Sequence, residues 1–440
     1  MPKLLLINPS PVRYNISRRG IKIQPLNLAY LCACTPLHWD IEIIDENFCD
    51  APIMNDVDLV GITTLTATAN RAYELSQNYM KRNIAVVLGG IHASCVPEEA
   101  IQYCNSVVIG EGETIWPRVL KDYENGEMKS FYKAEQNEFD VSIQPRRDLF
   151  LNKYKFATVQ TSRGCPFDCE FCCVKVFNGN KFRQRKIDDV ILELESIPQK
   201  YILFSDDNLI GYSKNSIERA KDLFRIMIQK KLNKIWFCQT SLNFADDEEL
   251  LNLAYRSGCR FILVGIESID ENVLNGNMSK VLNGKKSPGY YKKFIDIIHR
   301  RGITLIGNMI FGNDEEKSTI FNDTLKFYDK CNLDIPWPGI LVPYPGTKLY
   351  KRLEKENRII YKNYPNDWSK YNSKVVFNPI GYSDNDFVDM FKSFTSNTYS
   401  NLRVLSRTLS TYKYSKSLFQ SLIVFMLNRS LQERFRSIGN

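Results

Sequence analysis

The chain has 440 residues, of which 25% are charged and 44% are hydrophobic, values typical of a globular protein with two or three domains. It begins Met-Pro-Lys followed at once by a short apolar run, and no apolar stretch approaches the roughly 18 residues of a membrane-spanning helix. We therefore expect a cytoplasmic protein whose twelve cysteines are reduced thiols or metal ligands.

The net charge of +8 is concentrated near the C-terminus. Residues 401–440 hold seven Lys or Arg against a single acid, Glu433, so the other 400 residues are close to neutral. The body of the chain therefore carries no basic patch of the kind that binds nucleic acid, and we expect no nucleic-acid partner.

The first third of the chain alternates short apolar runs with helical patterns. Strands are predicted at 4–8, 41–45, 59–63, 85–89 and 106–110, and helices at 26–37, 69–82 and 97–103. This alternation predicts a doubly wound α/β domain, which binds ligands at the carboxyl ends of its strands.

Three of the predicted strands end in small, polar loops. These loops are Thr63-Thr-Leu-Thr-Ala-Thr, Gly89-Gly-Ile-His and Gly110-Glu-Gly-Glu. Glycine lets a bulky ligand approach the backbone closely, so the loops favour a nucleotide-like ligand without naming it. The polar stretch at 121–155 is predicted to be an irregular linker.

Three cysteines with unusual spacing follow the linker. Cys165, Cys169 and Cys172 form a C-x3-C-x2-C motif directly after an apolar, β-branched stretch at 156–162. A cubane iron–sulfur cluster usually takes four cysteines, so three would leave one iron open to another ligand. Zinc sites usually pair C-x2-C with a second pair or with histidines, which makes zinc the weaker alternative. Cys173 is interpreted as a neighbour and not as a ligand.

After the motif, helices and strands alternate again. Helices are predicted at 187–196, 214–231, 246–257, 289–301 and 316–329, and strands at 201–205, 235–239, 261–265, 304–311 and 334–342. With the strand before the cysteines this gives six strands, which predicts an open (β/α)6 barrel of the TIM type. Such barrels keep their chemistry at the carboxyl ends of the strands.

The last hundred residues are expected to be mainly helical. The segment 418–431 is apolar with basic flanks, so it could either dock on the body or lie on an anionic membrane surface, and docking is favoured. The predicted domains are 1–140 with a linker to about 155, 156–345 and 346–440.

The cysteine motif, with Arg-Gly-Cys-Pro before it and Phe-Cys within it, resembles that of the radical S-adenosylmethionine (SAM) enzymes. The resemblance implies that the three cysteines hold a [4Fe–4S] cluster whose open iron chelates the amino and carboxylate groups of SAM. An electron from the cluster then cleaves SAM to methionine and a 5′-deoxyadenosyl radical.

The same resemblance assigns roles to residues at the strand ends. It implies SAM contacts from Asp206, Asp207 and Asn208 after the second strand, Gln239 and Ser241 after the third, Glu267 of a Gly-Ile-Glu-Ser motif, and Asn308 near the adenine. Tyr344, in a Pro-Tyr-Pro-Gly-Thr signature of the subgroup, is the candidate catalytic residue. For each of these positions, a polar strand cap or a tight turn is the competing interpretation.

The order of the N-terminal loops resembles the cobalamin-binding domain fused ahead of many radical SAM enzymes. The implied cobalamin contacts are Thr63, Thr64, Thr66, Gly89, Gly90, His92, Gly110, Glu111 and Gly112. Many such domains carry Asp-x-His-x-x-Gly after the first strand, but the loop at 8–17 has no histidine, so it supplies no cobalt ligand. For His92, a hydrogen bond to the cofactor or a structural role is preferred to cobalt ligation.

The sequence therefore predicts a cobalamin-dependent radical SAM methyltransferase that methylates an unactivated carbon of a small-molecule or lipid-like substrate. A radical cyclase or rearrangement enzyme, a radical SAM enzyme that has lost cobalamin, and a methylthiotransferase remain alternatives. The last lacks support, because neither an N-terminal cysteine trio nor a β-rich tail is visible. The expected partners are an electron donor such as flavodoxin or ferredoxin and, through residues 401–440, a membrane surface.

Overall fold

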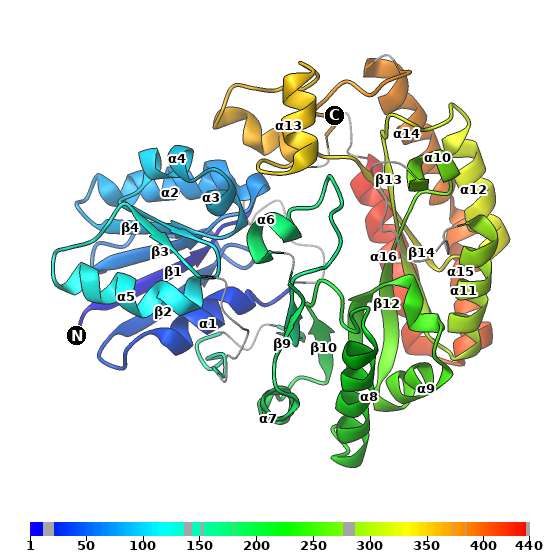
Figure 1. Ribbon diagram of the computed structural model, residues 1–440, viewed down its shortest axis with the longest axis horizontal. Coiled ribbons are helices and arrows are strands. Elements are labelled where there is room, and N and C mark those ends of the chain that lie inside the picture. Colours follow the sequence, from blue (N-terminus) through cyan, green and yellow to red (C-terminus); the bar gives the residue numbers. More distant parts are fainter. Residues whose placement is uncertain are drawn as a thin grey trace.

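Two parallel sheets, each flanked by helices, form the body of the protein. The computed structural model describes residues 1–11, 22–135, 143–150, 154–179, 181–275, 287–372, 374–382 and 384–436. The two sheets lie side by side, with helix α6 (Val174–Asn178), which follows the cysteine motif, between them (Figure 1). The predicted fold class, a doubly wound domain followed by a partial barrel and a helical C-terminal region, is confirmed.

The N-terminal sheet is entirely parallel and has the strand order β2-β1-β3-β4-β5-β6. Its strands are β1 (Lys3–Asn8), β2 (Asp40–Asp45), β3 (Leu59–Thr63), β4 (Ala85–Gly89), β5 (Ser106–Ile109) and β6 (Phe131–Lys133). Strand β1 lies between β2 and β3, so the chain order reverses there. A doubly wound sheet opens a crevice for ligands at the carboxyl end of such a reversal.

Helices cover both faces of this sheet because the central strands are apolar on both faces. Leu5 and Ile7 pack toward α2, and Leu4 and Leu6 pack toward α1 and α5. The helices are α1 (Leu26–Cys34), α2 (Ala69–Met80), α3 (Ile91–Cys95), α4 (Pro97–Ala100) and α5 (Gly112–Glu124), with short 3₁₀ helices η1 (Thr66–Thr68) and η2 (Ile101–Tyr103).

The prediction of an irregular linker over 121–155 is wrong for its first part, residues 121–133. Helix α5 continues to Glu124, and residues 131–133 form β6, which pairs in parallel with β5. Residues 112–124 form an amphipathic helix that buries Trp116, Val119 and Leu120. The sequence did not predict this helix because most of its residues are polar. The N-terminal sheet therefore has six strands where the sequence predicted five.

The second sheet has the order β14-β13-β12-β11-β10-β7 and is also parallel. Its strands are β7 (Phe156–Val159), β10 (Tyr201–Phe204), β11 (Ile235–Thr240), β12 (Cys259–Glu267), β13 (Thr304–Phe311) and β14 (Ile335–Ile340). Strands β7 and β14 form the two edges, so the barrel is open, as predicted. Two short strands, β8 (Ser162–Arg163) and β9 (Arg183–Gln184), pair antiparallel at the neck of the cysteine loop.

Side-chain caps fix where several barrel helices begin. Ser213, Asp247 and Ser287 accept backbone N–H groups at the starts of α8, α9 and α11, as expected of N-cap residues. The helices are α7 (Ile187–Ser196), α8 (Lys214–Gln229), α9 (Glu248–Ser257), α10 (Glu271–Asn275), α11 (Pro288–Arg300) and α12 (Ile320–Cys331), with η3 (Leu242–Ala245) after β11.

The C-terminal region is mainly helical and contacts both sheets. It comprises α13 (Lys348–Lys355), η4 (Asn366–Tyr371), α14 (Asp384–Thr398), α15 (Asn401–Ser415) and α16 (Leu418–Arg436). Trp368 of η4 belongs to the core of the N-terminal sheet, and Val424 and Leu431 of α16 belong to the core of the barrel. Helix α16 is therefore docked on the body, as favoured by the sequence. Across the described ranges, no helix is both long and apolar enough to span a bilayer.

Candidate functional site

The three motif cysteines lie on the loop between β8 and α6, beyond the carboxyl end of the first barrel strand, β7. Gly164 starts the loop with φ +86°, and a side chain there would overlap the carbonyl of Lys181. Within the loop, the Cys172 N–H donates to the Cys169 carbonyl at 3.1 Å. No group of three or more His, Cys, Asp or Glu side chains in the described part of the chain is arranged around a single metal ion. Three thiols on one loop can bind an iron–sulfur cluster and leave one iron open to another ligand.

Asp206 and Asp207 hold the neck of the cysteine loop. One oxygen of Asp206 accepts hydrogen bonds from the Thr161 N–H at 3.0 Å, the Thr161 hydroxyl at 2.9 Å and the Ser162 hydroxyl at 2.6 Å. Asp207 accepts from the Gly164 N–H at 3.0 Å and from the Asn178 amide at 3.1 Å. Burial raises the pKa of Asp206 to about 6 and also raises the pKa of Asp207. Both predicted SAM contacts are thus also supports of the cluster loop.

Polar atoms without protein partners gather at the carboxyl ends of β10 and β11. The Asn208 amide donates to the Ser241 hydroxyl at 3.1 Å. Among the described residues, Asp206 Oδ2, Asn208 Oδ1 and Thr240 Oγ1 are buried without a hydrogen-bond partner. Buried polar groups rarely stay unsatisfied, so these atoms indicate a place where a polar ligand sits.

The inner wall of the barrel is only partly covered. On β11, and on β13 from Ile306 on, every second residue is partly or fully exposed, including Gln239 and Asn308, while the residues between them are buried. Gln239 and Asn308 therefore face the barrel interior, and their contacts with SAM stay a prediction. Trp337 of β14 takes the same kind of position.

Glu267 occupies a strained position at the end of β12. Its φ is +63°, in the left-handed region that side chains other than glycine rarely adopt, and its side chain is buried. The pairing of β12 with β13 shifts register between Gly265 and Glu267. Bulges and strained backbones of this kind cluster at functional sites, which supports the predicted role of Glu267.

The Pro-Tyr-Pro-Gly-Thr segment lies where the two domains and the cysteine loop meet. A side chain at Gly346, where φ is +81°, would touch Val176 of α6 and Cys95 of α3. Burial, followed by the neighbouring Cys173 thiol, raises the pKa of Tyr344. Tyr344 is therefore close to the cysteine loop, as a catalytic candidate must be.

Helix α13 covers the cysteine loop from the C-terminal side. Arg352 pairs with Glu170, which lies between the second and third motif cysteines, at 2.8 Å, and the Glu170 carbonyl accepts the Leu349 N–H at 3.0 Å. These contacts place the C-terminal region over the barrel mouth.

The predicted cobalamin loops meet at the carboxyl edge of the first sheet. Thr64 joins two of them, donating its hydroxyl to the Gly89 carbonyl at 2.7 Å and accepting the Ala93 N–H at 3.0 Å. Gly90 has φ +94°, and a side chain there would collide with the Thr64 backbone. Thr63 accepts the Asn27 amide at 2.9 Å, and Gly110 donates its N–H to Ser94 at 3.0 Å.

The His92 side chain is fully buried, and its contacts are with neighbouring protein side chains. Its Nδ1 lies 3.3 Å from the Thr66 hydroxyl, and its ring packs edge-on against Trp368 at 5.1 Å. The nearest carboxylate, Glu99, is 3.6 Å from Nε2, beyond hydrogen-bond distance, and accepts from Trp368 at 2.8 Å. This packing supports the structural role of His92 over cobalt ligation.

Glu111 belongs to a buried ion cluster between the domains. It accepts from Arg163 at 2.8 Å and from Arg183 at 3.1 Å, and Glu113 also pairs with Arg163. Burial opposes ionisation of Glu111, but the hydrogen bond from Arg183 and the charge of Arg163 outweigh it, so its pKa lies below the ordinary value. Its carboxylate therefore supports the cysteine loop from the cobalamin side, a partner that the sequence did not indicate.

Two family models match the chain, the B12 binding domain over residues 13–120 and the Radical SAM superfamily over residues 159–326. The chain therefore combines the two domains that characterise cobalamin-binding radical SAM enzymes. It is 28% identical to bacteriochlorophyllide d C-12(1)-methyltransferase of Chlorobaculum tepidum over 421 residues, 92% of this chain and 89% of that protein. The C-8(2)-methyltransferase of the same organism is 29% identical over 368 residues, 79% of this chain and 78% of that protein.

The fold also matches a solved structure over its whole length. The radical SAM methyltransferase TsrM of Kitasatospora setae, with cobalamin and a [4Fe–4S] cluster bound, covers 99% of both chains with a TM-score of 0.70 at 16% identity. At this identity the likeness concerns the fold alone.

A [4Fe–4S] cluster, SAM and cobalamin are the cofactors of this radical SAM enzyme. The three thiols after β7 fit the cluster, and the unsatisfied atoms of Asp206, Asn208 and Thr240 fit a polar ligand beside it. The loops beyond β3 and β4 meet at the carboxyl edge of the first sheet, where a doubly wound domain binds its ligand.

Sequence reasoning missed residues that support or border these sites. Arg163 and Arg183 were not singled out, although Arg163 is part of the Arg-Gly-Cys-Pro motif. Leu65, between two predicted threonine contacts, is 53% exposed at the edge of the crevice. A bulky apolar residue inside a polar strand-end loop was the available signal for Leu65.

Proposed function

We propose that this radical SAM enzyme transfers a methyl group to an unactivated carbon of an apolar small-molecule or lipid-like substrate. The observation that carries the proposal is the likeness, over most of the chain, to two proteins named as methyltransferases at defined carbon positions of bacteriochlorophyllide d. When bound, the three cofactors supply abstraction of a substrate hydrogen and a methyl group for the carbon that lost it.

The roles of the chain's own residues follow from their positions. Cys165, Cys169 and Cys172 hold the cluster as thiolates, and Asp207 fixes the start of their loop through the Gly164 N–H. Asp206, Asn208, Gln239, Ser241, Glu267 and Asn308 form the set proposed to bind and orient SAM at the strand ends. The strand-end loops of the first sheet, with Leu65, hold cobalamin against the barrel mouth.

The substrate is expected to be largely apolar, because the wall of the barrel interior is apolar. Phe237, Ile306, Ile310 and Trp337 are partly covered positions that alternate with buried ones on β11, β13 and β14. Burying an apolar ligand against such a wall is favourable at roughly 25 cal/mol per Å². Tyr344, at the junction above this wall, is the residue proposed to contact the substrate near the reacting carbon.

Labelled SAM tests the proposal. The anaerobically reconstituted enzyme, with cobalamin and a flavodoxin as reductant, is incubated with SAM carrying a deuterated methyl group and a lipid-soluble cell extract. We expect a product that carries the deuterated methyl group and is absent with the Cys165→Ala/Cys169→Ala/Cys172→Ala variant. A modified product without the label, formed while SAM is cleaved, would instead identify a cyclase or rearrangement enzyme.

A further inference from the structure

Helices α15 and α16 form an antiparallel pair that exposes an unusual amount of apolar surface. Eight of the seventeen large apolar side chains that are exposed in the described chain lie on these two helices. They are Leu402, Leu405, Leu409 and Tyr412 on α15, and Leu418, Leu422, Phe425 and Met426 on α16. We call these eight side chains the outer face of the hairpin. Exposed apolar clusters of this kind mark interaction surfaces.

The hairpin directs much of its polar surface inward. The Gln420 amide donates to the Gly302 carbonyl at 2.9 Å, and the Asn428 amide donates to the Asp334 carbonyl at 3.0 Å. On α15, Thr411 donates to Asp334 at 2.7 Å, and the buried Arg407 donates to the Thr398 carbonyl at 2.8 Å. A surface helix normally does the reverse and turns its apolar side chains inward. The outer face therefore suits apolar surroundings and not water.

Positive charge accompanies the outer face. Lys413 lies four residues after Leu409 and Arg429 lies four residues after Phe425, so helical spacing places these two cations beside outer-face residues. Lys416 follows directly after the last residue of α15. All three are exposed, and Glu433 is the one acid in residues 401–440. The hairpin thus combines apolar side chains with a strong excess of positive charge.

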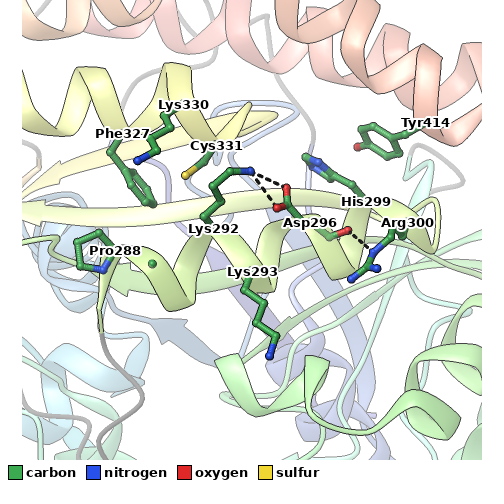
Figure 2. Close-up of a pocket in the computed structure, with 11 residues that line it drawn as sticks. Pro288, Lys292, Lys293, Asp296, His299, Arg300, Phe327, Lys330, Cys331 and Tyr414 are labelled. Carbon is green, nitrogen blue, oxygen red and sulfur yellow. Dashed lines mark hydrogen bonds and ion pairs between the residues drawn. The ribbon is translucent and has the colours of Figure 1, made fainter.

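A groove lined by several basic side chains lies beside the end of α15. Tyr414 of α15 forms one wall of a pocket of about 790 Å³ between α11, α12 and α15. Figure 2 shows Lys292, Lys293 and Lys330 around it, with Lys292 paired to Asp296 at 2.9 Å. Such a groove attracts anionic groups.

We propose that the outer face of the hairpin lies on the surface of an anionic lipid bilayer. Leucine, phenylalanine and methionine side chains would enter the boundary between headgroups and acyl chains, while Lys413, Lys416 and Arg429 contact anionic headgroups. A second copy of the chain fits the same face less well, because a twofold interface would bring the like charges of both copies together. This inference does not depend on the proposed methyl transfer.

Vesicle flotation of the full-length protein tests the proposal. The vesicles contain phosphatidylcholine alone or phosphatidylcholine with phosphatidylglycerol, at low and high salt. We expect flotation with the anionic vesicles that weakens as salt rises. Lys413→Gln/Lys416→Gln should lower partitioning roughly thirtyfold, since each cation contributes about 1 kcal/mol.

Two triple variants test whether binding depends on the outer face or on exposed apolar side chains anywhere on the protein. Leu409→Ser/Leu422→Ser/Phe425→Ser should lower partitioning roughly a hundredfold, because it removes three side chains from the boundary. Leu37→Ser/Leu192→Ser/Ile380→Ser changes three exposed apolar side chains elsewhere and should leave flotation unchanged.

Three results would overturn the proposal. One is the absence of flotation of the wild-type protein with anionic vesicles at low salt. Another is an equal loss of flotation in both triple variants, or in neither. The third is a wild-type protein that does not bind vesicles but sediments as a dimer, while the Leu409→Ser/Leu422→Ser/Phe425→Ser variant sediments as a monomer. That result would assign the outer face to contact between two copies of the chain.

Discussion

Single side chains at the barrel mouth each support both the fold and the site. Asp206 and Asp207 hold the ends of the cysteine loop with one oxygen each, and Asp206 keeps its second oxygen unsatisfied within the described part of the site. A carboxylate that is half engaged in this way stays in place and can still accept a hydrogen bond from a ligand. This is how a rigid scaffold positions a polar group before the ligand arrives.

The cysteine assignment makes the first prediction. Changing Cys165, Cys169 and Cys172 together to alanine should remove the iron and abolish reductive cleavage of SAM, because no thiolate of the motif remains to bind the cluster. Iron content and 5′-deoxyadenosine formation measure this. Cys173→Ala should keep both, and its loss of the cluster would show that the ligand set has been assigned wrongly.

The second prediction concerns pH. Burial raises the pKa of Asp206 from its ordinary value of 3.8 to about 6, so between these values the folded state binds the proton more tightly than the unfolded state does. The contribution of Asp206 to the free energy of unfolding is therefore fully present below the lower value and is lost as pH rises through the upper one. The loss amounts to at most about 3 kcal/mol.

Asp206→Asn keeps the accepting oxygen and removes the titration. Urea unfolding of cluster-free protein, measured across that pH interval, should show a shallower fall in stability for this variant than for the wild type. Asp40→Asn, at an exposed carboxylate, serves as the control and should change nothing. Equal slopes for Asp206→Asn and the wild type would contradict the assignment.

At the scale of elements, the two sheets are joined by charges and not only by packing. Arg163 and Arg183, on β8 and β9, meet Glu111 at the start of α5, and Arg185 donates to Tyr30 of α1 at 3.2 Å. Paired charges set a geometry more strictly than apolar contact does, because their hydrogen bonds are directional. The ion cluster therefore fixes where the cobalamin crevice lies relative to the cysteine loop.

Removing one partner from this cluster should be costly. Glu111→Ala leaves Arg163 and Arg183 buried with less opposite charge, which should lower the free energy of unfolding by about 3–5 kcal/mol. Calorimetry or denaturant unfolding measures the loss. Glu127→Ala, at an exposed acid after α5, should cost far less, and equal costs would show that the cluster does not act as described.

Sequence patterns predicted those elements whose patterns were strong. The apolar strands β1, β3 and β4 and the amphipathic helices of the barrel lie within a few residues of the expected positions. Helix α5 and strand β6 were missed because α5 is mostly polar with Pro117 inside it and β6 has only three residues. Short edge strands take their structure from the neighbouring sheet, so their own sequence carries little information.

At the site, the sequence could identify residues but not pairings. The strand-end positions of Asp206, Gln239 and Asn308 followed from the alternation of strands and helices. The partners of Glu111 and His92 did not, because Arg183 and Trp368 lie far from them in the chain. Local patterns cannot show which distant side chains a fold brings together.

At the scale of the whole molecule, the C-terminal region links the two domains. Trp368 of η4 is buried against His92, and its indole N–H donates to Glu99. Trp368→Ala should lower the free energy of unfolding by about 3–5 kcal/mol through the cavity that it leaves.

Cobalamin binding gives the second readout for Trp368→Ala. Because His92 and η1 border the crevice, we expect weaker binding of hydroxocobalamin, measured by equilibrium dialysis, with the iron content of the barrel unchanged. The exposed Leu37→Ala is the control. If Trp368→Ala lowers the free energy of unfolding by the expected amount but leaves the affinity for cobalamin unchanged, η4 supports the fold and not the cobalamin site.

The contribution of η4 to the core of the first domain also affects when that domain can complete its folding during synthesis. Trp368, Tyr371 and Val376 complete the hydrophobic core of a domain whose own strands are translated long before them. While the ribosome makes the barrel, the emerged N-terminal sheet lacks these side chains, and the neighbourhood of His92 stays uncovered. The first domain therefore completes its hydrophobic core only after the barrel has been synthesised.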